Sequence, residues 1–153
     1  MSELRDMRSE DLQAVLSIER NAQLSPWSRL SFEESLNREH YCRVLEHDGL
    51  VVAYHVICAA SDELHVLNVV VAKPQQGQGF AHHLMQDIFD YAQSLEEITA
   101  IYLEVRASNH VAQHLYERWG FAQTAIRKAY YQAINKKVKR EDAIIMCRRL
   151  ASC

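Results

Sequence analysis

Residues 64–95 decide the fold, because a strand, a glycine loop and a helix follow one another there without interruption. The strand is Leu64–Ala72 (Leu-His-Val-Leu-Asn-Val-Val-Val-Ala), a largely apolar run typical of the centre of a sheet. The loop is Gln75-Gln76-Gly77-Gln78-Gly79. A helix is predicted over residues 79–95, where apolar residues recur every four positions. Its ridge consists of Phe80, Leu84, Ile88 and Ala92, backed by Ala81, Met85 and Phe89.

The strand–Gly-x-Gly–helix unit is typical of sites that bind anionic phosphates. Glycines let the backbone approach the ligand closely, while the free amides and the dipole of the helix point at its negative charge. His82 leaves the Gly-x-Gly-x-x-Gly dinucleotide fingerprint incomplete, and no Gly-Lys-Ser/Thr follows as a Walker loop requires. A glycine turn that only caps the helix is the alternative. The position between an apolar strand and a long amphipathic helix favours phosphate binding.

Upstream of this unit, the pattern predicts a short strand, two helices and a hairpin. The strand is Leu4–Arg8, and a helical period follows over residues 10–22. Ser31 and Glu34 have the spacing of a capping box, which predicts a second helix over residues 31–38. Asp48-Gly49 is a strong two-residue turn signal between the strands Tyr41–His47 and Leu50–Ala60.

Downstream, the pattern predicts a strand, a helix and two final strands. The strand is Thr99–Arg106, the helix is Asn109–Arg118, and Gly120 suits the end of a helix. Phe121–Tyr130 and Ala143–Arg149 follow as strands joined by a polar, basic loop. The order β-α-α-β-β-β-α-β-α-β-β predicts one domain over residues 1–153, a mixed α/β fold with helices on both sides of its sheet.

The composition is that of an ordinary soluble globular protein, with 48% apolar and 24% charged residues. No apolar run approaches the ~18 residues of a membrane helix, and the acidic N-terminus lacks the apolar segment of a signal peptide. The cysteines show no Cys-x-x-Cys spacing, which favours buried thiols in a reducing compartment. We therefore expect a cytoplasmic protein without membrane contact. The four cysteines are Cys42, Cys58, Cys147 and Cys153.

The net charge of −3 hides an asymmetry between two parts of the chain. Residues 127–149 hold eight basic and two acidic groups, a net of +6, and the rest holds nine basic and eighteen acidic groups, a net of −9. The acidic part favours a cationic partner, and the basic segment could contact RNA or an anionic cofactor. Two solvated faces are the alternative. The basic residues are Arg127, Lys128, Lys136, Lys137, Lys139, Arg140, Arg148 and Arg149.

A carboxylate, an amide and a phenol follow one another between residues 103 and 121. Glu104 lies in a predicted strand that we expect to be buried on both faces, so partial burial would make it a stronger general base. A structural ion pair with Arg106, two residues away on the same face, is the alternative. Asn109 and Tyr116 are seven residues apart and therefore share a helix face. Their structural alternatives are an N-cap at Ser108 or Asn109 and core packing of Tyr116.

Other catalytic classes lack their signatures. His110 and His114 are four residues apart, but no His-Glu-x-x-His accompanies them, so we expect no metal site. His82 and His83 are expected on the helix surface. No Gly-x-Ser-x-Gly elbow indicates a serine hydrolase.

Together these motifs resemble the GCN5-related N-acetyltransferases (GNATs), and within them the RimI-type alanine N-acetyltransferases of bacteria, which modify the N-terminus of a small-subunit ribosomal protein. The resemblance covers nearly the whole chain. The matching segments are Pro26-Trp27-Ser28, Asn68–Val71, the glycine loop, Leu103–Asn109, Leu115–Phe121, Tyr130-Tyr131 and Arg140–Met146.

The resemblance implies a mostly antiparallel sheet of about seven strands, with acetyl-CoA in a splay between strands 4 and 5. Val69 and Val71 would pair with the pantetheine arm, and the Val70 amide would donate to the thioester oxygen. Glu104 matches the proton acceptor of the subfamily, and Tyr116 matches its proton donor to the departing thiolate. The implied cofactor-binding residues are Val69, Val70, Val71, Gln75, Gln76, Gly77, Gln78, Gly79, Phe80 and Asn109.

One departure concerns the glycine loop. The superfamily loop usually begins with Gln or Arg, whereas Pro74 stands there in this chain, and Gln75 replaces a common cation. Pyrophosphate binding would then depend more on backbone amides. The resemblance predicts a monomeric enzyme whose acceptor is a ribosomal protein N-terminus, with no nucleic-acid contact beyond the ribosome. A small-amine or lysine acetyltransferase and a non-catalytic CoA-binding module are the alternatives.

Overall fold

The computed structural model describes residues 1–131 and 140–150 and contains seven strands and four α-helices in that part of the chain. The helices are α1 (Leu12–Ala22), α2 (Arg29–Asn37), α3 (Phe80–Ser94) and α4 (His110–Arg118), with short 3-10 turns η1 (Ser9–Asp11) and η2 (Lys73–Gln75). The strands are β1 (Ser2–Asp6), β2 (Tyr41–His47), β3 (Leu50–Ala60), β4 (Glu63–Val71), β5 (Ala100–Arg106), β6 (Ala122–Tyr131) and β7 (Glu141–Arg149).

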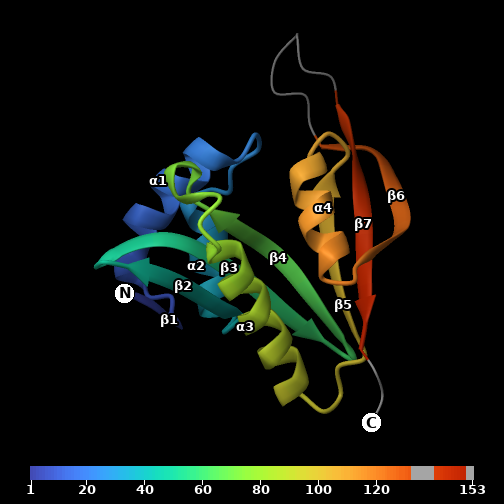
Figure 1. The fold of residues 1–153 in the computed structure, drawn as a ribbon, viewed down its shortest axis with the longest axis horizontal. Helices are drawn as coiled ribbons and strands as arrows, with labels where there is room; N and C mark the ends of the chain where they lie inside the picture. Colours follow the sequence, from blue (N-terminus) through green and yellow to red (C-terminus); the bar gives the residue numbers. More distant parts are fainter. Residues whose placement is uncertain (132–139, 151–153) are drawn as a thin grey trace. The chain divides into compact units, whose positions relative to one another are not determined.

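The predicted succession of elements and the mixed, mostly antiparallel sheet are confirmed (Figure 1). The strand order is β1-β2-β3-β4-β5-β7-β6. β4 and β5 pair in parallel from Glu63↔Ala100 to Val66↔Leu103, whereas β1–β2, β2–β3, β5–β7 and β6–β7 pair antiparallel. The splay between strands 4 and 5 stays a prediction.

The chain forms two compact units, and β4 contributes to both. The first unit consists of Met1–Cys58 and Leu67–Ser94, and the second consists of Ala59–Val66 and Leu95–Cys153. No helix in residues 1–131 and 140–150 is long and apolar enough to cross a membrane. Of the predicted basic loop, residues 136, 137 and 139 lie outside the described residues, as does Cys153. The cysteines Cys42 and Cys147 are buried as expected, and Cys58 is half-buried.

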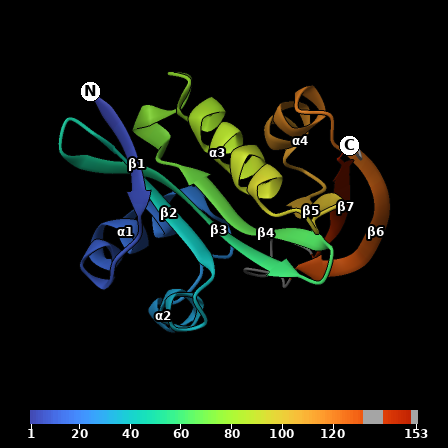
Figure 2. The same cartoon turned by 90° about the horizontal axis from the view of Figure 1, so that it is seen from below.

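Helices cover both faces of the sheet in the first unit, as predicted (Figure 2). On one face, α1 and α2 pack on β2, β3 and β4, and the fully buried residues there include Leu12, Val15, Phe32, Val44 and Tyr54. On the other face, Phe80 and Leu84 of α3 pack on Leu45, Val52 and Ala53. The four-residue ridge of α3 is buried because its period matches the turn of the helix.

Two turn predictions have different outcomes. The hairpin at Asp48-Gly49 is confirmed, since both residues have the positive φ (52° and 82°) of a type I′ turn. The capping box at Ser31 is wrong, because α2 begins at Arg29 and Ser28 is its N-cap. Ser28 has the extended backbone that a cap needs, and its hydroxyl accepts the Ser31 amide at 3.2 Å.

In the second unit, α4 lies beside β5 and β7 (Figure 1). Leu103, Val105, Ile144 and Met146 form buried parts of the two strands. The predicted helix-ending glycine is confirmed at Gly120, which has φ +86°. A Cβ there would lie 2.5 Å from Nε of Arg148, a flexible side chain that would have to shift, so the positive φ is the main reason for glycine.

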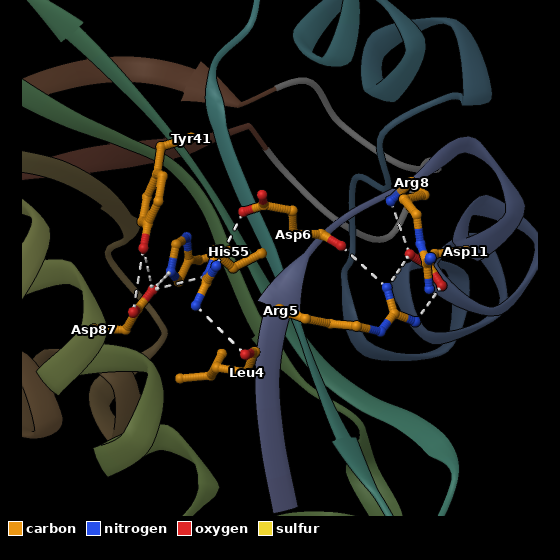
Figure 3. Close-up of polar contacts among 9 residues, drawn as sticks. Leu4, Arg5, Asp6, Arg8, Asp11, Tyr41, His55 and Asp87 are labelled. Atoms are coloured by element: carbon orange, nitrogen blue, oxygen red, sulfur yellow. Dashed lines mark hydrogen bonds and ion pairs between the residues drawn. The ribbon is translucent and has the colours of Figure 1, made fainter.

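A polar cluster attaches α3 to β2 and β3 (Figure 3). Asp87 of α3 lies 2.8 Å from Nε2 of the fully buried His55, and it accepts the Tyr41 hydroxyl at 3.1 Å. The Arg43 guanidinium lies 3.6 Å from Asp87 and 3.0 Å from Asp6. Although burial disfavours the charged carboxylate, the bond to His55 and the nearby cation keep the pKa of Asp87 below its usual value.

A second cluster joins β1 to η1. The Arg5 guanidinium binds both oxygens of Asp11, at 2.7 and 2.8 Å (Figure 3). It also lies 2.6 Å from Glu46. Asp11 also accepts the Arg8 amide at 2.8 Å. The hydrogen bonds from Arg5 lower the pKa of Asp11, so this carboxylate stays ionised at neutral pH.

We predict that His55 makes the fold sensitive to mild acid. Burial lowers the pKa of His55 because desolvation of the imidazolium outweighs the attraction of Asp87. In the unfolded chain the same histidine has an ordinary pKa of about 6.5. Below that pH the unfolded chain therefore binds more protons than the folded one, and the free energy of unfolding falls as the pH drops. Denaturant unfolding at pH 5.0 to 7.5 should show this slope in the wild type and a shallower one in His55→Gln.

His83→Gln is the control, because His83 is an exposed residue on the same helix as Asp87. This variant should keep the wild-type slope. Equal slopes in wild type and His55→Gln would contradict the prediction.

Candidate functional site

The glycine loop has open space beside its two glycines. Gly77 and Gly79 have φ of +81° and +87°, and no atom lies within 4 Å of where a Cβ would stand at either residue. α3 starts directly after Gly79 at Phe80. The first amides of an α-helix have no partner within the helix, so this arrangement offers donors to an anion.

Glutamine side chains hold the loop in shape. Gln76 donates to the Val71 carbonyl at 3.1 Å, and Gln78 donates to Gln75 at 3.4 Å. Pro74 lies in the first turn of η2, where an amide has no partner in the turn, so its missing N–H is tolerated. The departure from the usual superfamily loop is thus accommodated by the backbone, while the side chains at 75, 76 and 78 remain uncharged.

The strand before the loop alternates between the two faces of the first unit. Val70 is buried on the side of α1 and α2, whereas Val69 and Val71 pack on the side of α3. The Ala72 amide donates to the Val52 carbonyl at 2.8 Å, which fixes the end of β4 on β3. The predicted pairing of Val69, Val70 and Val71 with a cofactor stays a prediction.

The prediction that Glu104 lies in a strand buried on both faces is wrong. β5 alternates, so Leu103 and Val105 are buried while the side chain of Glu104 is 33% exposed. Its carboxylate lies 3.4 Å from Arg127 of β6, and Arg106, the partner in the alternative of a structural ion pair, lies 3.3 Å from Glu141. Leu103 and Val105 share one face of β5, and Glu104 lies on the other.

Arg127 is a site residue that the sequence reasoning missed. Its strand neighbour on β7 is Ala143, which in turn is paired with Arg106 of β5. Arg127 therefore lies across β7 from Arg106, and its guanidinium reaches Glu104, two residues earlier on β5. The sequence placed Arg127 only in a basic segment, because the register that brings it to β5 cannot be obtained from local pattern.

Tyr116 is buried in α4, with its ring 5.9 Å from that of Phe121. Burial, and then the neighbouring Tyr131, raise the pKa of Tyr116 above its ordinary value. The phenol therefore holds its proton at neutral pH, as a proton donor must. The same contacts also fit the core-packing alternative.

Asn109 is the N-cap of α4, which confirms the structural alternative for this residue. Its side-chain oxygen accepts the Ala112 amide at 3.1 Å. Ser108 instead binds Glu141 through its hydroxyl at 2.7 Å, and this bond is the main reason that the pKa of Glu141 is lowered. The expected role of Asn109 in cofactor binding stays a prediction.

The described residues contain no group of three or more His, Cys, Asp or Glu side chains that could hold a metal ion. His114 is 74% exposed and lies 3.7 Å from Glu117 on the same helix. His82 and His83 are exposed, as predicted.

The sequence model of the Acetyltransferase (GNAT) family matches residues 2–121. The chain belongs to this family. It is 32% identical over 146 residues to the [ribosomal protein bS18]-alanine N-acetyltransferase of Escherichia coli (strain K12), covering 95% of this chain and 96% of that protein. It is 33% identical over 145 residues, with 94% and 92% coverage, to the putative [ribosomal protein bS18]-alanine N-acetyltransferase of Bacillus subtilis (strain 168).

The fold agrees with these relatives. The crystal structure of the ribosomal-protein-S18-alanine N-acetyltransferase from Escherichia coli superposes with a TM-score of 0.90 and 31% identity. The match covers 100% of this chain and 96% of that chain. The resemblance to the GNAT family is therefore confirmed, as is its expectation of an acetyl-transferring enzyme.

We predict that Gly77 is needed for the binding of CoA. A valine there would be strained at φ +81° and would place a side chain in the open space beside the loop. Calorimetry with CoA should show at least a ten-fold loss of affinity for Gly77→Val. Gly49→Val is the matched control, because Gly49 has φ +82° and equally open space in a hairpin turn. The two variants should lose similar stability, and unchanged CoA affinity in folded Gly77→Val would remove this loop from the site.

Proposed function

We propose that this GNAT enzyme transfers the acetyl group of acetyl-CoA to the N-terminal alanine amine of a small-subunit ribosomal protein. The observation that carries the proposal is the 32–33% identity, over nearly the whole length, to proteins named as bS18-alanine N-acetyltransferases. A ribosomal acceptor implies activity in the cytoplasm. The enzyme is proposed to act as a monomer without a metal ion.

In this proposal, the glycine loop holds the pyrophosphate of acetyl-CoA. Its positive-φ glycines and the start of α3 support that role, because they present backbone amides without obstruction by side chains. The residues proposed to bind the cofactor are Val69, Val70, Val71, Gln75, Gln76, Gly77, Gln78, Gly79, Phe80 and Asn109.

The proposed reaction is direct transfer. The amine nitrogen attacks the thioester carbonyl, and its proton passes to the Glu104 carboxylate. The Val70 amide stabilises the tetrahedral oxyanion. The carbon–sulfur bond then breaks, and the thiolate takes the proton of Tyr116. The exposed carboxylate of Glu104 supports this assignment, since an acceptor amine can reach it from solvent.

Amine acidity favours an α-amine as acceptor. An α-amine with a pKa of about 7.7–8.0 is roughly 10% neutral at pH 7, whereas a lysine near 10.4 is neutral about once in 2,500 molecules. Deprotonation of the α-amine therefore requires about 3 kcal/mol less from the base. Lysine or small-amine acetylation and CoA binding without turnover are the outcomes that the next experiment separates.

The acceptor prediction is tested with synthetic peptides. A peptide that begins with alanine should be acetylated at its α-amine, as located by fragmentation mass spectrometry. The same peptide with a blocked α-amine and a free lysine should be inert, as should spermidine. Efficient acetylation of the blocked peptide would favour the lysine alternative, and binding of acetyl-CoA without any transfer would favour the non-catalytic module.

The roles of Glu104 and Tyr116 are separated by pH. Glu104→Gln keeps the shape but cannot accept a proton, so kcat/KM should fall by about 10²–10⁴. Higher pH should partly rescue this variant, because the amine then loses its proton to solvent without the help of a base. Tyr116→Phe removes the phenol hydroxyl and with it the proton to be donated, so its kcat should fall without rescue at high pH and with little change in acetyl-CoA affinity.

Two controls accompany these variants. Arg127→Gln removes the ion pair of Glu104 but leaves the carboxylate, so it should lose much less activity than Glu104→Gln. Tyr116→Phe with wild-type kcat and a lower melting temperature would show that Tyr116 serves only in packing.

A further inference from the structure

Glu19 is a fully buried carboxylate that the proposed reaction does not use. It lies near the end of α1 and is 0% exposed. Within residues 1–131 and 140–150, none of the ion pairs involves it. A buried carboxylate is costly without compensation, so its hydrogen bonds must account for its presence.

Three donors converge on Glu19. One oxygen accepts the Tyr54 hydroxyl at 2.6 Å and the Asn68 amide at 3.0 Å. The other oxygen accepts the backbone amide of Trp27 at 2.9 Å. The carboxylate therefore links strands β3 and β4 to the connection between α1 and α2.

The same network holds the connection at its other end. Asn68, itself only 6% exposed, accepts the side-chain amide of Gln23 at 3.0 Å while it donates to Glu19. Gln23 is the C-cap of α1, and Trp27 lies four residues later. Both ends of the segment 23–28 are thus fixed to one residue pair, Glu19 and Asn68.

These contacts explain the Pro26-Trp27-Ser28 motif. The Trp27 amide is bound by Glu19, and its ring packs on Phe32 with the centroids 5.1 Å apart. Ser28 caps α2. The motif therefore fixes the conformation of the connection, and none of these three contacts requires a ligand.

We infer that Glu19 is a positioning residue for acetyl transfer, which sets the segment 23–28 against β4. The inference rests on the proposed function, because Asn68 directly precedes Val69, Val70 and Val71, the proposed acetyl-CoA strand. With Glu19 in place, the segment 23–28 stays attached to β4, the strand proposed to bind acetyl-CoA. Without it, the segment is free to leave β4 while the glycine loop is unchanged.

Glu19→Gln tests the inference with minimal change of volume. Glutamine has one oxygen and one NH₂ group, so it cannot accept from Tyr54, Asn68 and the Trp27 amide as the carboxylate does. The NH₂ group would face a donor, and the bond to Trp27 is expected to be lost. kcat/KM for the alanine-initiated peptide should fall at least ten-fold, while CoA affinity by calorimetry should change less than two-fold.

Trp27 provides a readout that does not depend on activity. The chain has two tryptophans, so Trp119→Phe leaves Trp27 as the only one. In that background, acrylamide should quench Trp27 fluorescence at least twice as efficiently in Glu19→Gln as with Glu19 present. This measurement separates failure of the inference from failure of the proposed function, which would leave the quenching result intact.

Tyr54→Phe is the matched control. It removes one hydrogen bond from the same carboxylate and destabilises the same core, but it leaves the bond between Glu19 and the Trp27 amide. Tyr54→Phe should keep near wild-type kcat/KM and quenching at a similar loss of melting temperature. Equal effects of the two variants on kcat/KM and quenching, or wild-type quenching in Glu19→Gln, would overturn the inference and leave Glu19 as a core residue only.

Discussion

The structure of the first unit depends on the alternation of side chains along the second half of β4. Asn68 and Val70 face the layer of α1 and α2, and Val69 and Val71 face α3. Both faces are covered at the end of the strand, where Val69, Val70 and Val71 follow one another, and Asn68 directly before them is the buried polar residue. The buried amide of Asn68 is tolerated since Glu19 and Gln23 satisfy it at both ends. This fixes the end of β4, from which the glycine loop and α3 follow.

The sequence predicted the elements that are periodic and local. The hairpin at Asp48-Gly49, the ridge of α3 and the helix end at Gly120 are all confirmed, because each depends on residues within one turn or one helix. The cap of α2 was misplaced by three residues since Ser28 and Ser31 both have capping chemistry. Ser28 is the cap in the structure, and the residue before it, Trp27, donates its backbone amide to Glu19, eight residues earlier in the chain.

Long-range partners account for what the sequence could not predict about the candidate site. Glu104 was expected in a strand buried on both faces, but in β5 it is exposed between the buried residues Leu103 and Val105. Its ion pair with Arg127 requires the order β5-β7-β6 and the register that places Ala143 between Arg127 and Arg106. No local pattern encodes that register. The residue types of the site were thus predictable, whereas the contacts between them were not.

Three carboxylates show how environment separates roles that composition cannot distinguish. Glu104 is partly exposed and pairs with an arginine, and it is the carboxylate that we propose as the proton acceptor. Asp87 contacts a buried histidine, a tyrosine and an arginine, and these contacts attach α3 to β2 and β3. Glu19 has only neutral donors, and one of them is a backbone amide in an irregular segment. A neutral apolar residue could fill the volume of Glu19 but could not accept that amide. The carboxylate is therefore better explained by the conformation of the segment 23–28 than by the stability of the core.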